Sequence, residues 1–131
     1  MSWQAYVDTN LVGTGKVARA AILGQQGGVW ATSSNLTLSP EEQAAIVSAA
    51  KNAFNGAADQ VQANGLRLAG VKYFTLRLTD RSIYLKQGAN GAIIAKTKQA
   101  ILVAIYEEPI QAAEATPIVE SLADYLISVS Y

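Results

Sequence analysis

Residues 66–106, LRLAGVKYFTLRLTDRSIYLKQGANGAIIAKTKQAILVAIY, alternate runs of branched and aromatic residues with short turn signals. Because Val, Ile, Tyr and Phe are typical of strands while Gly, Asn and Asp are typical of turns, each run is predicted to be a strand. The predicted strands are Leu66–Leu68, Val71–Leu78, Ser82–Lys86, Ala92–Lys96 and Ala100–Tyr106. Their connections are too short for crossovers, so the segment is predicted to be an antiparallel meander.

Upstream of the meander, two further short strands and a helix are expected. Residues 20–23 and 29–32 are strand-like and are separated by the glycine-bearing loop 24–28, which predicts a β-hairpin. Ser39-Pro40-Glu41-Glu42 combines an N-cap serine, a proline at the first helical position and a glutamate at the third. We therefore expect a helix from Pro40 to about Phe54.

Helices are also predicted at both ends of the chain. The first is capped by Ser2 and stopped by Gly13, with Trp3, Tyr6, Val7, Asn10 and Leu11 at helical spacing. The last begins near Ala112 and buries a stripe of Ile118, Leu122, Leu126 and Val129. Pro117 is tolerable there only within the first turn. The result is one α+β domain over residues 1–131, with an antiparallel sheet of about six or seven strands.

Composition removes most enzyme chemistry. The 131 residues are 50% hydrophobic and 15% charged, with no cysteine and no histidine. Disulfides, thiolate nucleophiles, zinc fingers and Ser-His-Asp relays are therefore excluded, and we expect neither an enzyme nor a cofactor. Ten basic and ten acidic residues cancel, which argues against a nucleic acid partner. With no apolar run of membrane-spanning length, the protein is expected to be cytoplasmic.

Two smaller features of the sequence do not predict functional sites. The glycine clusters at 13–16 and 88–91 lack the spacing of a phosphate-binding loop, so both are interpreted as turns. Glu107 and Glu108 are adjacent at a strand end and point to opposite sides, which is poor geometry for paired acid and base catalysis. They are interpreted as solvated loop charge.

Charge is unevenly distributed along the chain. The meander carries +6, because its only acid is Asp80 while its basic residues are Arg67, Lys72, Arg77, Arg81, Lys86, Lys96 and Lys98. The last 25 residues carry −5 and have no basic residue. Two partner-binding surfaces of opposite sign and ordinary solvated strand faces both fit this pattern. Strand alternation places Lys72 and Arg77 on opposite faces, so they share a patch only if a bulge or a strand end intervenes.

Aromatic residues gather at the two chain ends. Tyr125 lies about 80° from the centre of the apolar stripe of the last helix, so its ring should be half exposed. If the terminal helices pack side by side, Trp3, Tyr6 and Tyr125 form a shared aromatic ledge. Core packing is the competing explanation for these rings.

Four motifs together resemble the profilin family, which binds actin monomers. They are SWQAYVD at 2–8, VWATS at 29–33, DRSIY at 80–84 and LADYLI at 122–127. The match runs through nearly the whole chain, and the RSIY element is more similar to fungal and amoeboid profilins than to plant or animal ones. The resemblance implies both terminal helices on one face of the sheet and the other helices on the opposite face. It also implies three ligand classes: monomeric actin (1:1), proline-rich proteins such as formin-type assembly factors, and polyphosphoinositide headgroups at the membrane surface.

The resemblance also implies site residues. For proline-rich, polyproline II peptides these are Trp3, Tyr6, Trp30, Leu122, Tyr125 and Tyr131. For actin they are Lys72, Thr75, Arg77, Lys86, Lys96, Gln111, Ala113 and Thr116. For phosphoinositide headgroups they are Arg77, Arg81, Lys86 and Lys96, which overlap the actin set. The resemblance therefore implies that the protein is a cytoplasmic, cytoskeleton-associated regulator of actin polymerisation.

Three departures from the family pattern leave an alternative open. Leu85 stands where the family usually has glycine, so a differently shaped loop is expected there. Ala112-Ala113 replaces the usual Pro-Gly before the last helix, and Pro117 is unusual. The alternative is therefore a proline-rich-peptide-binding module with weak or lost actin binding.

Overall fold

Seven antiparallel strands form the sheet at the centre of the fold, in the order β2-β1-β7-β6-β5-β4-β3. The computed structural model describes residues 2–53, 65–79 and 81–131. The strands are β1 (Arg19–Gly24), β2 (Val29–Thr32), β3 (Leu66–Leu68), β4 (Val71–Leu78), β5 (Ser82–Gln87), β6 (Asn90–Lys96) and β7 (Ala100–Tyr106). The predicted hairpin and meander are both confirmed, with every adjacent pair antiparallel.

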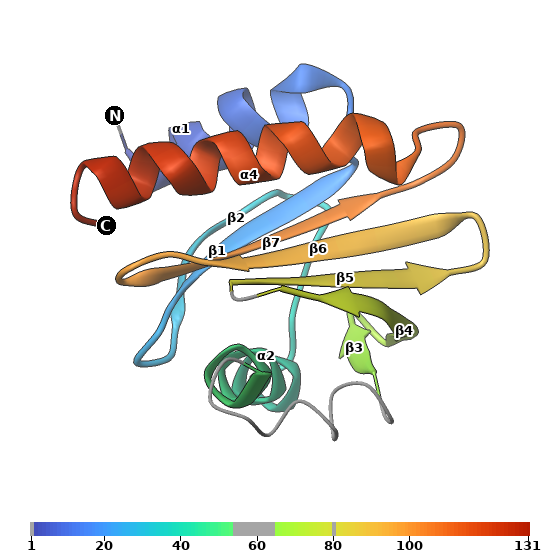
Figure 1. The fold of residues 1–131 in the computed structure, drawn as a ribbon, viewed down its shortest axis with the longest axis horizontal. Coiled ribbons are helices and arrows are strands. Elements are labelled where there is room, and N and C mark those ends of the chain that lie inside the picture. The colour runs from blue at the N-terminus through green and yellow to red at the C-terminus, as the bar shows by residue number, and fades with distance from the viewer. Residues whose placement is uncertain (1, 54–64, 80) are drawn as a thin grey trace.

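Helices cover both faces of the sheet, as Figure 1 shows. The N-terminal helical segment and α4 (Ala112–Ser128) lie on one face, and α2 (Pro40–Ala53) lies on the other. This arrangement confirms the predicted α+β fold.

Helix α2 begins with the predicted capping box. The Ser39 hydroxyl accepts from the Glu42 amide at 3.1 Å, and the Glu42 carboxylate accepts from the Ser39 amide at 3.0 Å. Phe54, where this helix was expected to end, lies outside the described residues.

The N-terminal helical segment differs in type from the predicted α-helix. Only α1 (Trp3–Ala5) is α-helical, and it is followed by the π-helix η1 (Tyr6–Leu11) and the 3-10 helix η2 (Val12–Thr14). The prediction that Gly13 stops the helix is wrong by two residues. Helical structure ends at Gly15, whose φ of 78° is left-handed and therefore favours glycine.

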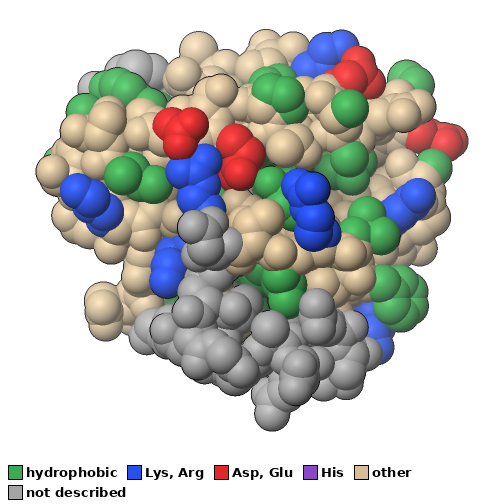
Figure 2. Space-filling model, viewed as in Figure 1, with side chains coloured by type: hydrophobic (Ala, Val, Ile, Leu, Met, Phe, Trp, Pro, Cys, Tyr) green, Lys and Arg blue, Asp and Glu red, His purple; other side chains and the backbone are tan. Residues whose placement is uncertain are grey.

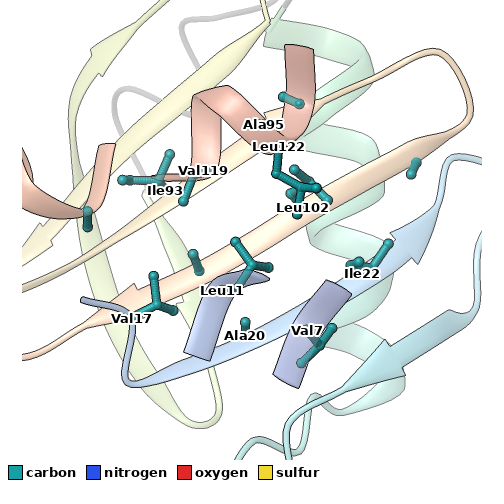
Figure 3. Packing of buried hydrophobic residues seen from close by; sticks show 14 of the residues in the cluster. Val7, Leu11, Val17, Ala20, Ile22, Ile93, Ala95, Leu102, Val119 and Leu122 are labelled. Atoms are coloured by element: carbon teal, nitrogen blue, oxygen red, sulfur yellow. The ribbon is translucent and has the colours of Figure 1, made fainter. Parts of the chain in front are cut away.

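Two buried clusters fill the space between the sheet and its helices. On the terminal-helix face, Val7 and Leu11 pack with Val119 and Leu122 over the sheet residues Ile22 and Leu102, as Figure 3 shows. On the other face, α2 packs through Ile46 and Ala50 against residues that include Ile83, Leu85 and Ile101. Leu85 is fully buried inside β5, so the expectation of a differently shaped loop there is wrong.

Helix α4 corrects two further expectations. Pro117 lies at the sixth helical position, beyond the first turn, and its ring nitrogen cannot donate to the Ala113 carbonyl. The capping box of Gln111 and Glu114 secures the turn before it, because Glu114 also accepts from the Gln111 amide at 3.0 Å. Leu122 and Leu126 are buried as predicted, whereas Val129 is 42% exposed because it lies at the C-cap, past the last helical turn.

A β-bulge interrupts β4. Thr75 pairs with Leu85 and Arg77 pairs with Tyr84, so Leu76 has no partner across the strand pair. One extra residue reverses the alternation of side chains along the strand. Lys72 and Arg77 therefore lie on the same face of the sheet. The sequence alone predicts a shared basic patch only where such a bulge or a strand end intervenes.

Candidate functional site: an aromatic ledge and a basic sheet face

Five aromatic rings form a continuous surface where the two chain ends meet; we call Trp3, Tyr6, Trp30, Tyr125 and Tyr131 the aromatic ledge. The Trp3 ring lies 4.8 Å from Trp30, 5.3 Å from Tyr131 and 5.6 Å from Tyr6, measured between centroids. Tyr6 in turn lies 6.2 Å from Tyr125. These spacings and the tilted or edge-on angles are typical of favourable aromatic pairs.

Local hydrogen bonds hold the N-terminal part of the ledge. The Ser2 hydroxyl accepts from the Ala5 amide at 3.2 Å and starts the helix that carries Trp3. The Gln4 side-chain amide donates to the Thr32 carbonyl at 2.8 Å, which ties this helix to the strand that carries Trp30. A Cβ at Gly24 would lie 2.6 Å from Trp30 Nε1, so only a residue without a side chain leaves room for the indole ring there.

Tyr131 is held against the ledge through its backbone. Its main-chain oxygen accepts from the Thr97 hydroxyl at 2.7 Å and from the Gln99 amide. The Gln99 side chain also donates to the Ser130 carbonyl at 2.9 Å. The turn between β6 and β7 thereby places the Tyr131 ring edge-on to Trp3. Figure 1 shows both chain ends at this end of the molecule.

The ledge is open to solvent and continues into a groove. Tyr125 is 50% exposed, as its helical position predicted, and Tyr131 and Trp30 are 45% and 38% exposed. Leu122 is buried and forms part of the groove floor. The groove has a volume of about 460 Å³ and is lined by Tyr6, Asn10, Pro117, Ile118, Ser121, Leu122 and Tyr125.

The environment of Tyr6 keeps its hydroxyl group uncharged. Burial is the main cause that raises the pKa of Tyr6, and its interactions with Tyr125 and Tyr131 raise it further. The Tyr6 hydroxyl therefore stays protonated at neutral pH and remains a hydrogen-bond donor. Exposed flat rings with hydroxyl and indole donors suit a ligand that offers apolar faces and bare carbonyl acceptors.

A second surface lies on β4 and β5, on the terminal-helix face of the sheet; we call Lys72, Arg77 and Lys86 the basic face. The Arg77 guanidinium lies 4.5 Å above the Tyr84 ring, and the Lys72 ammonium lies 5.7 Å from the Phe74 ring. Lys86 pairs with Phe74 across the strands, so it points to the same side. The bulge at Leu76 brings Arg77 to the side on which Lys72 and Lys86 already lie.

Arg81 and Lys96 lie elsewhere. Arg81 donates to Asp124 at 2.7 Å and lies 3.7 Å from the Glu120 carboxylate, so it joins β5 to α4. Lys96 lies five residues from Gly91, the partner of Lys86, or about 17 Å along the strand. Lys96 also pairs with Ile101, whose side chain faces α2. The structure therefore divides the four residues expected at the headgroup into two separate pairs.

The other residues expected at actin are also divided. Thr75 pairs with the buried Leu85, so it points to the α2 side of the sheet. Gln111, which is exposed, lines a groove of about 460 Å³ together with Leu76 and Lys86. Ala113 and Thr116 follow Gln111 in the first turns of α4, exposed and partly buried respectively. The start of α4 and the basic face therefore adjoin each other.

Sequence reasoning missed several residues of these surfaces. Asn10 and Ser121 line the groove beside the ledge, and Phe74 and Leu76 lie exposed within the basic face. The available signal was the alternation of residues along Val71–Leu78, which puts Phe74 and Leu76 on the same side as Lys72. In the described part of the chain, no group of three or more acidic side chains is placed to hold a metal ion.

The fold and ledge define a small α+β binding domain whose terminal helices jointly present an aromatic surface. The Profilin family model matches residues 1–131, and the chain belongs to the profilin family. It is 53% identical to Profilin-1B of Acanthamoeba castellanii and 49% identical to the profilin of Saccharomyces cerevisiae, each over the whole of both chains.

Solved structures agree with this assignment. Acanthamoeba castellanii profilin IB superposes with a TM-score of 0.91 at 52% identity, covering 99% of this chain and all of the other. Mouse Profilin IIa, in complex with a double repeat from the FH1 domain of mDia1, shares the fold with a TM-score of 0.78 at 22% identity, with full coverage of both chains. None of the helices in the described ranges is long and apolar enough to cross a membrane.

Proposed function

We propose that the chain is a non-enzymatic regulator of actin polymerisation that binds proline-rich peptides at the aromatic ledge. The observation that carries this proposal is the contact of Trp3 with three other rings, on a surface that is exposed and uncharged. A polyproline II helix is already extended, so little conformational entropy is lost when it binds. The mouse relative solved with an FH1 repeat supports formin-type proteins as one partner class.

Monomeric actin, bound one to one, is proposed for the basic face and the adjoining start of α4. Lys72, Arg77 and Lys86 present positive charge to an acidic partner, which speeds encounter. The exposed Phe74 and Leu76 supply apolar contact area at the centre of this surface. Since Leu85 is buried on the α2 side, its replacement of glycine leaves this surface intact, which supports actin binding over the alternative of a peptide module with weak or lost actin binding.

The two proposed sites lie at opposite ends of α4. The helix has 17 residues, so its ends are about 25 Å apart. Gln111 and Lys86 lie near its start, and Tyr125 and Tyr131 lie near its end. This separation supports simultaneous binding of actin and a proline-rich assembly factor, in the cytoplasm and in association with the cytoskeleton.

Polyphosphoinositide headgroups are proposed to bind at the basic face, with Arg77 and Lys86 as the principal contacts. Several cations on one patch can pair with multiple phosphates, and this binding weakens steeply as salt rises. Arg81 lies just before β5, where it is bound to Asp124, and Lys96 faces the α2 side of the sheet, so neither adjoins Arg77 and Lys86. Since the headgroup and actin share residues, they are expected to compete.

Titration with pure monomeric actin, with and without a saturating proline-rich peptide, tests the central proposal. Binding of both ligands to one chain at once is the expected result. If the peptide binds and actin does not at any accessible concentration, the alternative of a peptide module replaces the proposal. Vesicles bearing the headgroup, added to the preformed actin complex, should release actin.

A further inference from the structure

Two cations of the basic face lie against aromatic rings, but the rings are held differently. The Arg77 guanidinium carbon lies 4.5 Å from the centroid of the Tyr84 ring, and the Lys72 ammonium lies 5.7 Å from that of the Phe74 ring. Both distances allow attraction between a cation and a ring face. The Phe74 ring is 61% exposed, whereas the Tyr84 ring is buried. Only Arg77 therefore lies against a ring that is itself fixed.

Tyr84 is fixed by packing and by a hydrogen bond. It belongs to the cluster buried between the sheet and the terminal helices. Its hydroxyl donates to the Glu120 carboxylate at 3.0 Å, and the same carboxylate accepts from the buried Ser82 hydroxyl at 2.7 Å. Burial is the main cause that raises the pKa of Tyr84, and Glu120 raises it further. The hydroxyl therefore stays protonated at neutral pH and keeps its bond to α4.

The bulge in β4 is what places Arg77 against this ring. Arg77 pairs with Tyr84 because the register skips Leu76. Had the register continued from Thr75 without a bulge, Arg77 would pair with Ile83, which faces α2. Side chains directly opposite each other in a strand pair are in contact, so the bulge brings the guanidinium onto the Tyr84 ring.

The stacked guanidinium is suited to receive a partner's carboxylate. Arg77 is exposed, and within the described ranges it forms no ion pair. Lys72 and Lys86 each line a groove that also contains a glutamate, and Arg77 lines neither groove. A guanidinium stacked by its face keeps N–H donors at its edge, where they match both oxygens of a carboxylate. Figure 2 shows basic side chains at the surface next to α4, on the side where Figure 1 places β5 and β4.

We propose that Tyr84 is a positioning residue for actin binding: it holds the Arg77 guanidinium in the orientation that receives a carboxylate of actin through paired hydrogen bonds. This inference rests on the actin binding proposed above and adds a reason why position 77 requires an arginine and not only a positive charge. A side chain that is ordered before binding loses less conformational entropy, which is worth about two- to tenfold in affinity.

Charge-preserving substitutions test the requirement for a guanidinium. Arg77→Lys keeps the charge and removes the planar group, so affinity for pure monomeric actin should fall about fivefold. Lys72→Arg is the matched control and should change the affinity less than twofold, because no anchored ring lies beside it. Wild-type affinity in Arg77→Lys, or an equal loss in Lys72→Arg, would overturn the proposal.

A double-mutant cycle tests whether Tyr84 acts through Arg77. Tyr84→Leu removes the ring and should weaken actin binding about fivefold, and adding Arg77→Lys to it should cause no further loss. Tyr84→Phe keeps the packed ring and loses only the bond to Glu120, so it should lower stability and leave actin affinity within about twofold. Additive losses in the cycle, or a loss in Tyr84→Phe equal to that in Tyr84→Leu, would overturn the positioning role.

Nuclear magnetic resonance of the free protein measures the stacking itself. Protons above the face of an aromatic ring are shifted upfield, so the Arg77 side-chain signals should be shifted in wild type and in Tyr84→Phe but not in Tyr84→Leu. The wild-type measurement decides the matter even if Tyr84→Leu does not fold. If wild type binds actin and its Arg77 signals are unshifted, only the positioning inference is wrong. If wild type does not bind actin, the proposed actin function is wrong and the inference falls with it.

Discussion

At the scale of single residues, Trp3 is the centre of the aromatic ledge because it contacts three of the other four rings. Residues with many contacts at the middle of a binding surface dominate its energetics. Trp3→Ala should therefore weaken binding of a proline-rich peptide by more than about 2 kcal/mol. Isothermal titration calorimetry measures the loss, with Val29→Ala, an exposed apolar change beside the ledge, as the control. Unchanged affinity in a folded Trp3→Ala variant would exclude the ledge as the peptide site.

Gly24 has an effect on the ledge without belonging to it. A methyl group at this position would lie within 3 Å of three atoms of the Trp30 indole. Because Trp30 is partly exposed, we expect Gly24→Ala to displace the ring rather than unfold the strand. The variant should change Trp30 fluorescence and weaken peptide binding several-fold with native circular dichroism. Gly27→Ala in the same hairpin is the control, because no atom lies within 4 Å of the added carbon. An equal loss of peptide affinity in Gly27→Ala would show that contact with the Trp30 ring is not the cause.

At the scale of elements, Glu120 is the side chain that joins α4 to β5. Its carboxylate accepts from the buried Ser82 hydroxyl at 2.7 Å and from the Tyr84 hydroxyl at 3.0 Å. Arg81 approaches the same carboxylate at 3.7 Å. The RSIY stretch that carried part of the resemblance is therefore a structural connection between the sheet and the helix.

Removal of that connection should destabilise the fold. Glu120→Ala leaves the buried Ser82 hydroxyl without its partner, and we expect a loss of about 1–3 kcal/mol in the free energy of unfolding. Asp124→Asn is the control, since Asp124 is exposed and an exposed ion pair contributes about 1 kcal/mol or less. Chemical denaturation measures both. Equal losses in the two variants would show that burial at Glu120 is unimportant.

At the scale of the whole molecule, the distance between the two proposed surfaces leads to independent binding. Arg77→Glu reverses a charge on the basic face and leaves the ledge at the other end of α4 untouched. Actin affinity should fall at least about tenfold, while peptide affinity should stay within error. Titrations with each ligand provide the measurement. A parallel loss of both affinities with native circular dichroism would contradict the two-surface arrangement.

The stability of the whole fold should depend on pH mainly at the alkaline end. Burial raises the pKa of Tyr73, Tyr84 and Tyr106 above the ordinary value of about 10. Above that pH the unfolded chain loses phenolic protons that the folded protein keeps, so the free energy of unfolding falls as pH rises. Thermal melts from about pH 6 to 9 should be flat and then decline. A maximum of stability above pH 10 would contradict this sign.

The pH dependence of stability at acidic pH has a separate cause. Hydrogen bonds from the Lys16 ammonium and the Gln111 amide lower the pKa of Glu114. The stability that this carboxylate contributes is present above its ordinary pKa and is lost as pH falls through the folded value. Because the chain has no histidine, we expect no transition near pH 6.5.

Much of the fold follows from local sequence. All seven strands, the Ser39 capping box and the half exposure of Tyr125 depend on neighbours within a few residues, which a sequence displays directly. The type of the first helix, the position of Pro117 beyond the first turn and the exposure of Val129 were missed, since each depends on packing at a helix end. Several site residues, including Ala113 and Thr116, keep a role that stays a prediction.

Non-local contacts account for the rest. Trp3, Trp30 and Tyr131 come from three distant segments, and only the sheet register and the Thr97 hydrogen bond bring their rings together. The bulge at Leu76 depends on how β4 pairs with β5, and it decides that Arg77 joins the basic face. Arg81 has the same charge but is held by Asp124 of α4. Composition and spacing reveal which residues can bind a ligand, whereas pairing across strands and helices sets which of them face the same way.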